Sequence, residues 1–196
     1  MEYEAAGGQE MIRDLYVIDL ETTHLEPWAG HIVEVGICRV DLGRRCVFPE
    51  YGRIVNVDLD EDEKKAWVFQ NTDLTPDDVE QSPYGWPVIA YELQRLMMHG
   101  VFTSYNQSFD FGWLEQYGIA PDFTADIMDM VTDDYGRRLS AQAAYRYYCP
   151  DNPARLPQST EDHRALSDAV MESYIMLEMC KSGIYRRTVL NDLVTQ

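Results

Sequence analysis

Two carboxylates that stand one residue apart follow an apolar run near the start of the chain. The run is Leu15 to Ile18, and the pair is Asp19 and Glu21. Side chains two residues apart on a strand point to the same side, so both carboxylates can approach one divalent cation. In a chain with 34 acidic residues, such a pair alone is more typical of a solvated corner between a strand and a loop. Further acids are needed to make it informative.

Two more acids and a histidine occupy positions where α/β proteins carry function. Asp110 follows the segment YNQSF at a predicted strand-to-helix transition, a place that often bears functional side chains, although an acid there also complements the helix dipole. Asp168 borders the apolar stripe of a later helix. His163 is five residues earlier, about 140° away around a straight helix, which places it at the start of that helix.

The elements that must position these residues alternate in type along the chain. β-Forming runs at 15–18, 32–40 and 46–57, with turn residues between the last two, predict an antiparallel meander. A helix is predicted over 88–99, a strand over 101–105 and a helix over 109–117. Further helices are predicted near 61–69, 124–131, 140–148 and 162–181. This order predicts an α/β protein whose mixed sheet is flanked by helices.

Composition describes an ordinary globular chain with a strong negative charge. The 196 residues are 45% hydrophobic and 26% charged, and their formal net charge is −18. We expect a loose lead-in over 1–13 and one domain over 14–196. The apolar runs are too short to span a bilayer and the acidic start is unlike a signal peptide, so a soluble, cytoplasmic protein without a membrane partner is predicted. The four cysteines lack zinc spacing.

Three ordered segments resemble motifs of one enzyme family. They are VIDLETTHL at 17–25, SYNQSFD at 104–110 and HRALSDA at 163–169. Together they resemble the DEDDh, or DnaQ-like, 3'-5' exonucleases, which include the epsilon proofreading subunit of DNA polymerase III, ribonuclease T and oligoribonuclease. The resemblance runs from about residue 15 to residue 180. It implies a ribonuclease H-like exonuclease fold with a central mixed sheet of five strands, three of them in an antiparallel meander.

The resemblance also implies a catalytic set and its cofactors. Four clustered carboxylates repel one another, and two Mg²⁺ or Mn²⁺ ions would neutralise them with oxygen ligands that suit these metals. By resemblance, Asp19, Glu21 and Asp168 hold the ion that activates water, Asp19 bridges both ions, and Asp110 acts on the second. His163 is then the general base.

Substrate contacts follow from the same resemblance. The backbone near Thr22 and Thr23 would meet the sugar of the terminal nucleotide, and Leu25 would wedge beside its base. Asn106 and Phe109 would line the path of the strand, although Phe109 would equally suit core packing. Stacking and wedging of this kind fit single-stranded ends, where bases are exposed.

Two positions depart from the family pattern. His24 stands where the family usually has glycine, and Tyr105 stands where a histidine is common. Both are expected to border the substrate, so they bear on specificity. His24 would either touch a phosphate or simply be exposed. The four tryptophans are interpreted as packing residues.

The sequence thus predicts a metal-dependent 3'-5' exonuclease that releases nucleoside 5'-monophosphates from single-stranded 3' ends, with DNA slightly favoured. The alternatives are an exoribonuclease or oligoribonuclease acting on RNA or short oligonucleotides, and a polymerase-associated proofreading module. The family includes dimers and polymerase-bound members, so either partner stays open. Because a chain of charge −18 offers few cations to a polyanion, weak and distributive action is expected.

Overall fold

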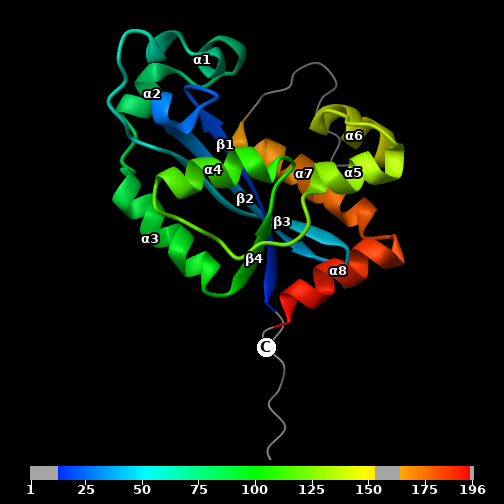
Figure 1. Cartoon of the computed structure of the whole chain (residues 1–196). Helices are drawn as coiled ribbons and strands as arrows, with labels where there is room; N and C mark the ends of the chain where they lie inside the picture. Colours follow the sequence, from blue (N-terminus) through cyan, green and yellow to red (C-terminus); the bar gives the residue numbers. More distant parts are fainter. Residues whose placement is uncertain (1–12, 153–163, 195–196) are drawn as a thin grey trace, which may run out of the picture.

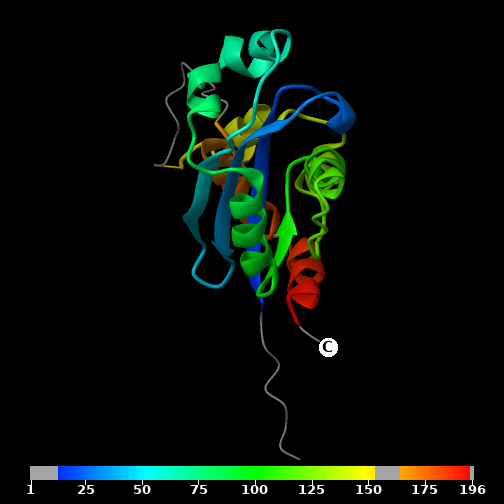
Figure 2. The same ribbon diagram turned by 90° about the vertical axis from the view of Figure 1, so that its left-hand side faces the viewer.

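The computed structural model describes residues 13–152 and 164–194. Nearly all of the predicted lead-in and the candidate base His163 therefore lie outside the described residues. The described chain forms one mixed sheet with helices on both of its faces (Figures 1 and 2). This architecture confirms the predicted fold class.

The sheet has the strand order β3-β2-β1-β4. Its strands are β1 (Asp14–Thr22), β2 (Ile32–Asp41), β3 (Cys46–Ile54) and β4 (Gly100–Thr103). β1, β2 and β3 form the predicted antiparallel meander, and β4 pairs with β1 in parallel. The carboxyl end of β1 is therefore central in the sheet, and its pairing with β2 shifts register between Glu21 and Thr22.

The expectation of five strands is wrong for the described chain, whose sheet has four. A fifth segment touches the edge strand β4 only at an isolated parallel bridge between Phe102 and Phe123. Two backbone hydrogen bonds hold it, from Phe102 N–H to Asp122 at 2.8 Å and from Thr124 N–H to Phe102 at 3.0 Å. Pairing then stops because Asp126 caps the next helix, accepting from the N–H groups at positions 128 and 129.

Alternating side chains of β1 divide the core into two layers. Leu15 and Val17 pack with residues of the later helices, whereas Tyr16, Ile18 and Leu20 pack on the other face with residues of the earlier helices. This period of two follows from the pleat of a strand. Continued along β1, it places positions 19 and 21 on the same face as Leu15 and Val17.

The helices confirm most predicted positions, with boundaries moved by a few residues. They are α1 (Trp67–Asn71), α2 (Pro76–Glu80), α3 (Trp86–Met97), α4 (Gln107–Gln116), α5 (Ile127–Tyr135), α6 (Ala141–Tyr148), α7 (Ala165–Met179) and α8 (Gly183–Leu193), with short 3₁₀ helices η1 (Pro27–Ala29) and η2 (Glu63–Lys65). Helices α3 and α4 contribute to one core layer, and α5 to α8 contribute to the other. Within the described ranges, no helix has the length and apolarity that crossing a bilayer requires.

The segment between β3 and α3 is more regular than its proline-rich sequence suggests. It contains η2, α1 and α2, and α2 begins with a capping box between Thr75 and Asp78. Val68, Leu74 and Val79 of this segment form a small apolar cluster with Val33 of β2. The segment is thereby fixed beside the carboxyl end of β1 (Figure 1).

Candidate active site

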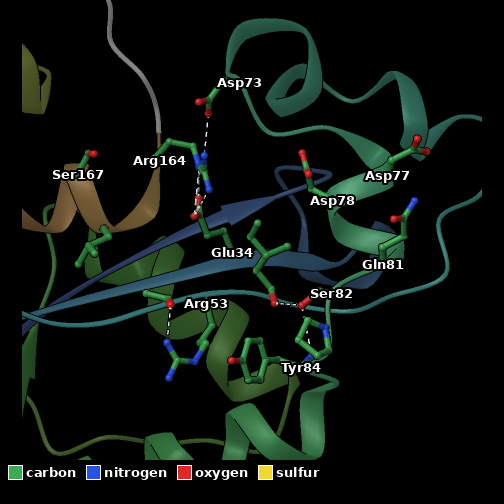
Figure 3. Close-up of a pocket in the computed structure, with 14 residues that line it drawn as sticks. Glu34, Arg53, Asp73, Asp77, Asp78, Gln81, Ser82, Tyr84, Arg164 and Ser167 are labelled. Carbon is green, nitrogen blue, oxygen red and sulfur yellow. Dashed lines mark hydrogen bonds and ion pairs between the residues drawn. The ribbon is translucent and has the colours of Figure 1, made fainter.

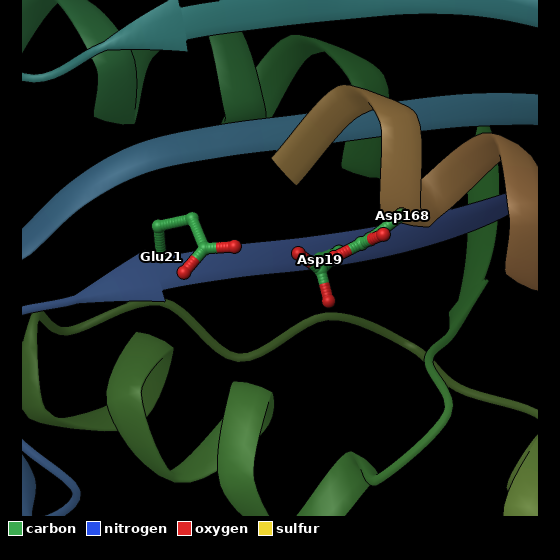
Figure 4. Close-up of side chains that lie close together, drawn as sticks. All are labelled: Asp19, Glu21 and Asp168. Carbon is green, nitrogen blue, oxygen red and sulfur yellow. The ribbon is translucent and has the colours of Figure 1, made fainter. Parts of the chain in front are cut away.

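Three carboxylates meet where β1 passes under the start of α7. Asp19 and Glu21 project from β1 toward α7, and Asp168 reaches them from the first turns of that helix (Figure 4). One oxygen from each of the three side chains lies within 4.8 Å of the others. The sequence prediction that these residues share one site is consistent with this geometry.

Helix α7 can lie this close to the sheet because β2 and β3 present glycines beneath it. A Cβ atom on Gly36 would stand 2.1 Å from the carbonyl carbon of Ala165 and 2.2 Å from the backbone nitrogen of Leu166. A Cβ on Gly52 would stand 3.0 Å from the Leu166 side chain. The backbone of α7 therefore rests directly on the backbone of β2, which sets how far Asp168 reaches.

An ion pair with the buried Glu34 fixes Arg164, the residue that precedes α7. Both carboxylate oxygens of Glu34 accept hydrogen bonds from the Arg164 guanidinium, at 2.7 to 3.1 Å, and one also accepts from the Ala165 N–H at 3.1 Å. Arg164 also donates to Asp73 at 2.8 Å (Figure 3). Glu34, which is 5% exposed, thus satisfies an unpaired N–H of the first turn and ties α7 to β2.

Asp110 is buried in the first turn of α4 and adjoins this cluster. It is 4% exposed, and burial raises its pKa to about 7. Its charge helps to raise the pKa values of both Asp19 and Glu21. Asp110 does not belong to the group of three oxygens within 4.8 Å, so the described carboxylates form a triad with a fourth acid beside it.

Burial and mutual repulsion raise the pKa values across the cluster. For Glu21, burial first and then the charge of Asp168 raise the pKa to about 9. Burial, followed by the charges of neighbouring acids, raises the pKa of Asp19 well above its usual range. Such a set of oxygen ligands fits a hard divalent cation, whose charge would offset this repulsion.

A fifth carboxylate was missed by sequence reasoning. Glu172 follows Asp168 by one turn of α7, is 4% exposed, and accepts a hydrogen bond from the Tyr105 N–H at 3.2 Å. Burial and the charge of Asp110 raise its pKa well above its usual range, and its own charge raises the pKa of Asp19. Its i+4 spacing from Asp168 was the available signal, because residues four apart share a helix face.

The loop between β1 and β2 carries the residues predicted to meet the sugar. Thr23 is buried, donates from its hydroxyl to Glu63 at 3.0 Å and accepts from the His31 N–H at 2.8 Å. Thr22 donates to the His24 carbonyl at 2.7 Å. His24 is exposed, and its ring nitrogen accepts from the N–H at position 26 at 3.0 Å.

The remaining predicted substrate residues differ in exposure. Leu25 is 78% exposed. Asn106 is the N-cap residue of α4, and its side-chain oxygen accepts from Ser108 at 3.0 Å. Phe109 is half-buried and packs edge-on against Trp113, with the ring centroids 6.4 Å apart. Phe109 therefore has a packing role. The substrate roles of Leu25, Asn106 and Phe109 stay predictions.

The interpretation of all four tryptophans as packing residues is wrong, and Tyr105 is more buried than its expected place beside the substrate suggests. Tyr105 is 6% exposed, and its hydroxyl donates to the Leu139 carbonyl at 3.1 Å, so a substrate role for this position stays a prediction. The tyrosine ring is long enough for its hydroxyl to reach the segment just before α6, and this contact explains why the side chain is buried. Trp113 and Trp86 do pack, but Trp28 and Trp67 are 77% and 57% exposed, because both lie on short surface helices that offer little cover.

A pocket of about 840 Å³ lies beside the triad and not over it. Arg164 and Asp73 line it together with Arg53 and Tyr84 of the opposite wall (Figure 3). Arg53 is held above the ring of Tyr84, 4.9 Å from its centroid. The described residues that line this pocket include Arg164 and Ser167 at the start of α7 but none of Asp19, Glu21 and Asp168. The pocket is therefore separate from the triad.

Similarity to known proteins agrees with this geometry. The sequence model of the RNase T exonuclease family matches residues 16–176. No curated protein is similar enough in sequence to match the chain. Among solved structures, exonuclease X in complex with 5' overhanging duplex DNA is 18% identical, with a TM-score of 0.63 over 91% of this chain and 99% of that chain.

Two further structures share the fold. E. coli exonuclease I with a 5cy-dT13 oligonucleotide is 13% identical, with a TM-score of 0.61 over 89% of this chain and 42% of that chain. A 3'-exonuclease in 3'-end specific recognition of a histone mRNA stem-loop is 12% identical, with a TM-score of 0.63 over 90% of this chain and 85% of that chain. The chain thus spans less than half of exonuclease I.

The family match covers most of the chain and includes β1 with Asp19 and Glu21, α4 with Asp110, and the start of α7 with Asp168. The fold is that of the ribonuclease H-like exonucleases. The chain therefore belongs to the DEDDh exonuclease family and is a 3'-5' exonuclease.

Proposed function

We propose that this exonuclease hydrolyses phosphodiester bonds at single-stranded 3' ends in a reaction that depends on two Mg²⁺ or Mn²⁺ ions, and that it releases nucleoside 5'-monophosphates. The observation that carries the proposal is the triad of Asp19, Glu21 and Asp168, whose oxygens lie within 4.8 Å of one another. DNA is the favoured substrate, in line with the DNA held by exonuclease X and exonuclease I.

The residues divide the work between cation binding and proton transfer. Asp19, Glu21 and Asp168 would hold one ion, and Asp19 and Asp110 would serve the second. Bound there, the ions would polarise the attacking water and stabilise the leaving oxygen. Because all four side chains are carboxylates, the site favours Mg²⁺ or Mn²⁺ over zinc.

His163 would act as the general base that takes the proton of the attacking water, since imidazole titrates near neutral pH. It lies outside the described residues, but the next residue, Arg164, is held by Glu34 and Asp73 one turn before Asp168. This anchoring supports a fixed start of α7 next to the triad.

One gel experiment tests the reaction and its polymer. Matched single-stranded DNA, RNA and mismatched-primer substrates are incubated with the chain in Mg²⁺, Mn²⁺ or EDTA. We expect 3' shortening that EDTA stops and that is fastest on single-stranded DNA. Asp19→Ala should lose both activity and Mn²⁺ binding. Shortening that persists in EDTA would refute the mechanism, and preference for RNA would move the assignment to the exoribonuclease alternative, for which the mRNA-bound relative is a precedent.

A second substitution separates the base from the cation ligands. His163→Ala should lower kcat by roughly 10²- to 10⁴-fold, because only proton transfer is removed. Mn²⁺ affinity, measured by calorimetry, should stay close to that of the wild type. Near-wild-type hydrolysis by this variant would remove His163 from the mechanism.

A further inference from the structure

The loop between β1 and β2, which begins after the triad residue Glu21, exposes two large apolar side chains. Leu25 and Trp28 are 78% and 77% exposed, the highest values among the large apolar side chains of the described chain. Single exposed apolar residues are ordinary on protein surfaces. Two of them, four and seven residues after the proposed cation ligand Glu21, need an explanation, and only Leu25 has one from the family resemblance.

This loop is fixed in place, so the exposure of Trp28 is not a result of fraying. The Thr23 N–H donates to the His31 carbonyl at 2.9 Å, and the Ala29 N–H donates to the Glu26 carbonyl at 3.0 Å. The Thr23 hydroxyl anchors the loop to η2 through its bond to Glu63. Gly30 permits this packing, because a Cβ there would stand 2.4 Å from the Thr23 hydroxyl oxygen.

The position of Trp28 relates it to the reacting end of a strand. It is the middle residue of η1, which packs against α4, the helix that presents Asp110. The loop begins directly after the triad residue Glu21. A strand that reaches the site alongside α4 would therefore run close to η1, where the indole ring is exposed.

The chemistry of the loop selects the kind of ligand. Residues 22–31 contain no lysine or arginine, and the whole chain carries a net charge of −18, so this loop offers a phosphate no permanent positive charge. An indole ring offers a π face to a nucleobase, and base stacking does not depend on a cation. A base in a duplex is already stacked on its neighbours, whereas an unpaired base is free to stack on the protein.

We propose that Trp28 stacks on an unpaired nucleobase close to the 3' end of the substrate and so favours single-stranded ends. The inference rests on the proposed exonuclease function and adds a specificity residue to it. Stacking supplies part of the binding free energy that an acidic chain cannot obtain from contacts with phosphates. Leu25 has no π face and is not the source of this preference.

The test combines tryptophan variants with substrates that lack one base. Trp28→Ala, Trp28→Phe and the control Tyr91→Ala, which removes an aromatic ring that is 63% exposed on α3, are assayed on single-stranded oligonucleotides. Each oligonucleotide carries an abasic sugar at one of the last positions. We expect Trp28→Ala to raise KM by about 5- to 100-fold with little change in kcat, Trp28→Phe to recover part of this loss, and the control to behave as wild type.

The abasic substrates identify the contact. At one position, loss of the base should weaken the wild type by a similar factor and leave Trp28→Ala unaffected. An unchanged KM in Trp28→Ala, or equal abasic penalties in both proteins at every position, would overturn the proposal. So would size-exclusion chromatography in which the wild type is a dimer and Trp28→Ala is a monomer, since the loop would then bind a second copy.

A binding arm keeps this inference distinct from the proposed function. Anisotropy of a labelled oligonucleotide, measured in Ca²⁺ with wild type and Trp28→Ala, reports binding whether or not hydrolysis occurs. Absence of hydrolysis by the wild type would count against the proposed function but not against stacking. Equal affinities of the two proteins for the labelled strand would count against stacking but not against the proposed function.

Discussion

At the level of single residues, Glu172 differs from the predicted cation ligands because it also joins two elements of the fold. One of its oxygens accepts the Tyr105 N–H at 3.2 Å. This bond joins α7 to the turn that leads into α4, so Glu172 links the helix of Asp168 to the helix of Asp110. It is a positioning residue whose charge also adds to the repulsion on Asp19.

The two effects of Glu172 can be separated by substitution. Glu172→Gln keeps an oxygen that accepts from Tyr105 and removes the charge, so the unfolding free energy in EDTA at pH 8 should be unchanged or higher. Glu172→Ala leaves a buried N–H unpaired and should lower it by about 1–3 kcal/mol. Urea unfolding followed by circular dichroism measures both. Equal losses in the two variants would show that the charge, and not the hydrogen bond, matters.

At the level of elements, the strand β2 decides where α7 lies. Gly36 provides the contact surface and Glu34 provides the cap, two residues earlier on the same strand. The sequence predicted the strand from its apolar pattern but could not show that these two positions receive a helix from the far end of the chain. Contacts of this kind depend on tertiary packing and leave no local periodicity.

Gly36→Ala tests this dependence. The added methyl group would overlap the backbone of Ala165, so we expect a loss of roughly 1–3 kcal/mol or more in unfolding free energy. Because α7 must move, Asp168 should also leave the triad and Mn²⁺ affinity should fall. Thermal unfolding and calorimetry measure the two effects.

Gly112→Ala is the matched control for this substitution. A Cβ at Gly112 meets no atom within 4 Å, and the residue lies inside α4, so alanine should stabilise the chain by about 0.5–1 kcal/mol. If Gly36→Ala were as stable as Gly112→Ala and bound Mn²⁺ normally, the packing of α7 on β2 would not control the site.

Sequence reasoning succeeded where local pattern and tertiary position coincide. The alternation of β1 predicted that Asp19 and Glu21 share a face, and the family resemblance predicted that Asp168 joins them. It failed where tertiary surroundings decide whether a large side chain is buried or exposed. The burial of Tyr105 depends on a carbonyl 34 residues away, and the exposure of Trp28 depends on its place in a three-residue surface helix.

At the level of the whole molecule, the net charge of −18 and the acidic site act in the same direction on stability. The folded chain holds Asp110 with a pKa of about 7 and Glu21 with a pKa of about 9, whereas unfolded carboxyl groups titrate near 4. Between these values the folded state binds more protons than the unfolded state. The unfolding free energy must therefore decrease as the pH rises through this range.

Cations should reverse this trend, because they bind the same oxygens once the protons leave. In EDTA, we expect the Tm to fall from pH 5.5 to pH 8.5, and in excess Mg²⁺ we expect the stabilisation by the metal to grow over that range, reaching about 3 kcal/mol at a hundredfold excess over Kd. Glu21→Gln should flatten the slope in EDTA, whereas Glu115→Gln, which removes one exposed charge from α4, should not. Equal slopes for both variants would assign the pH dependence to the net charge of the chain instead of the triad, and 0.5 M salt would then abolish it through screening.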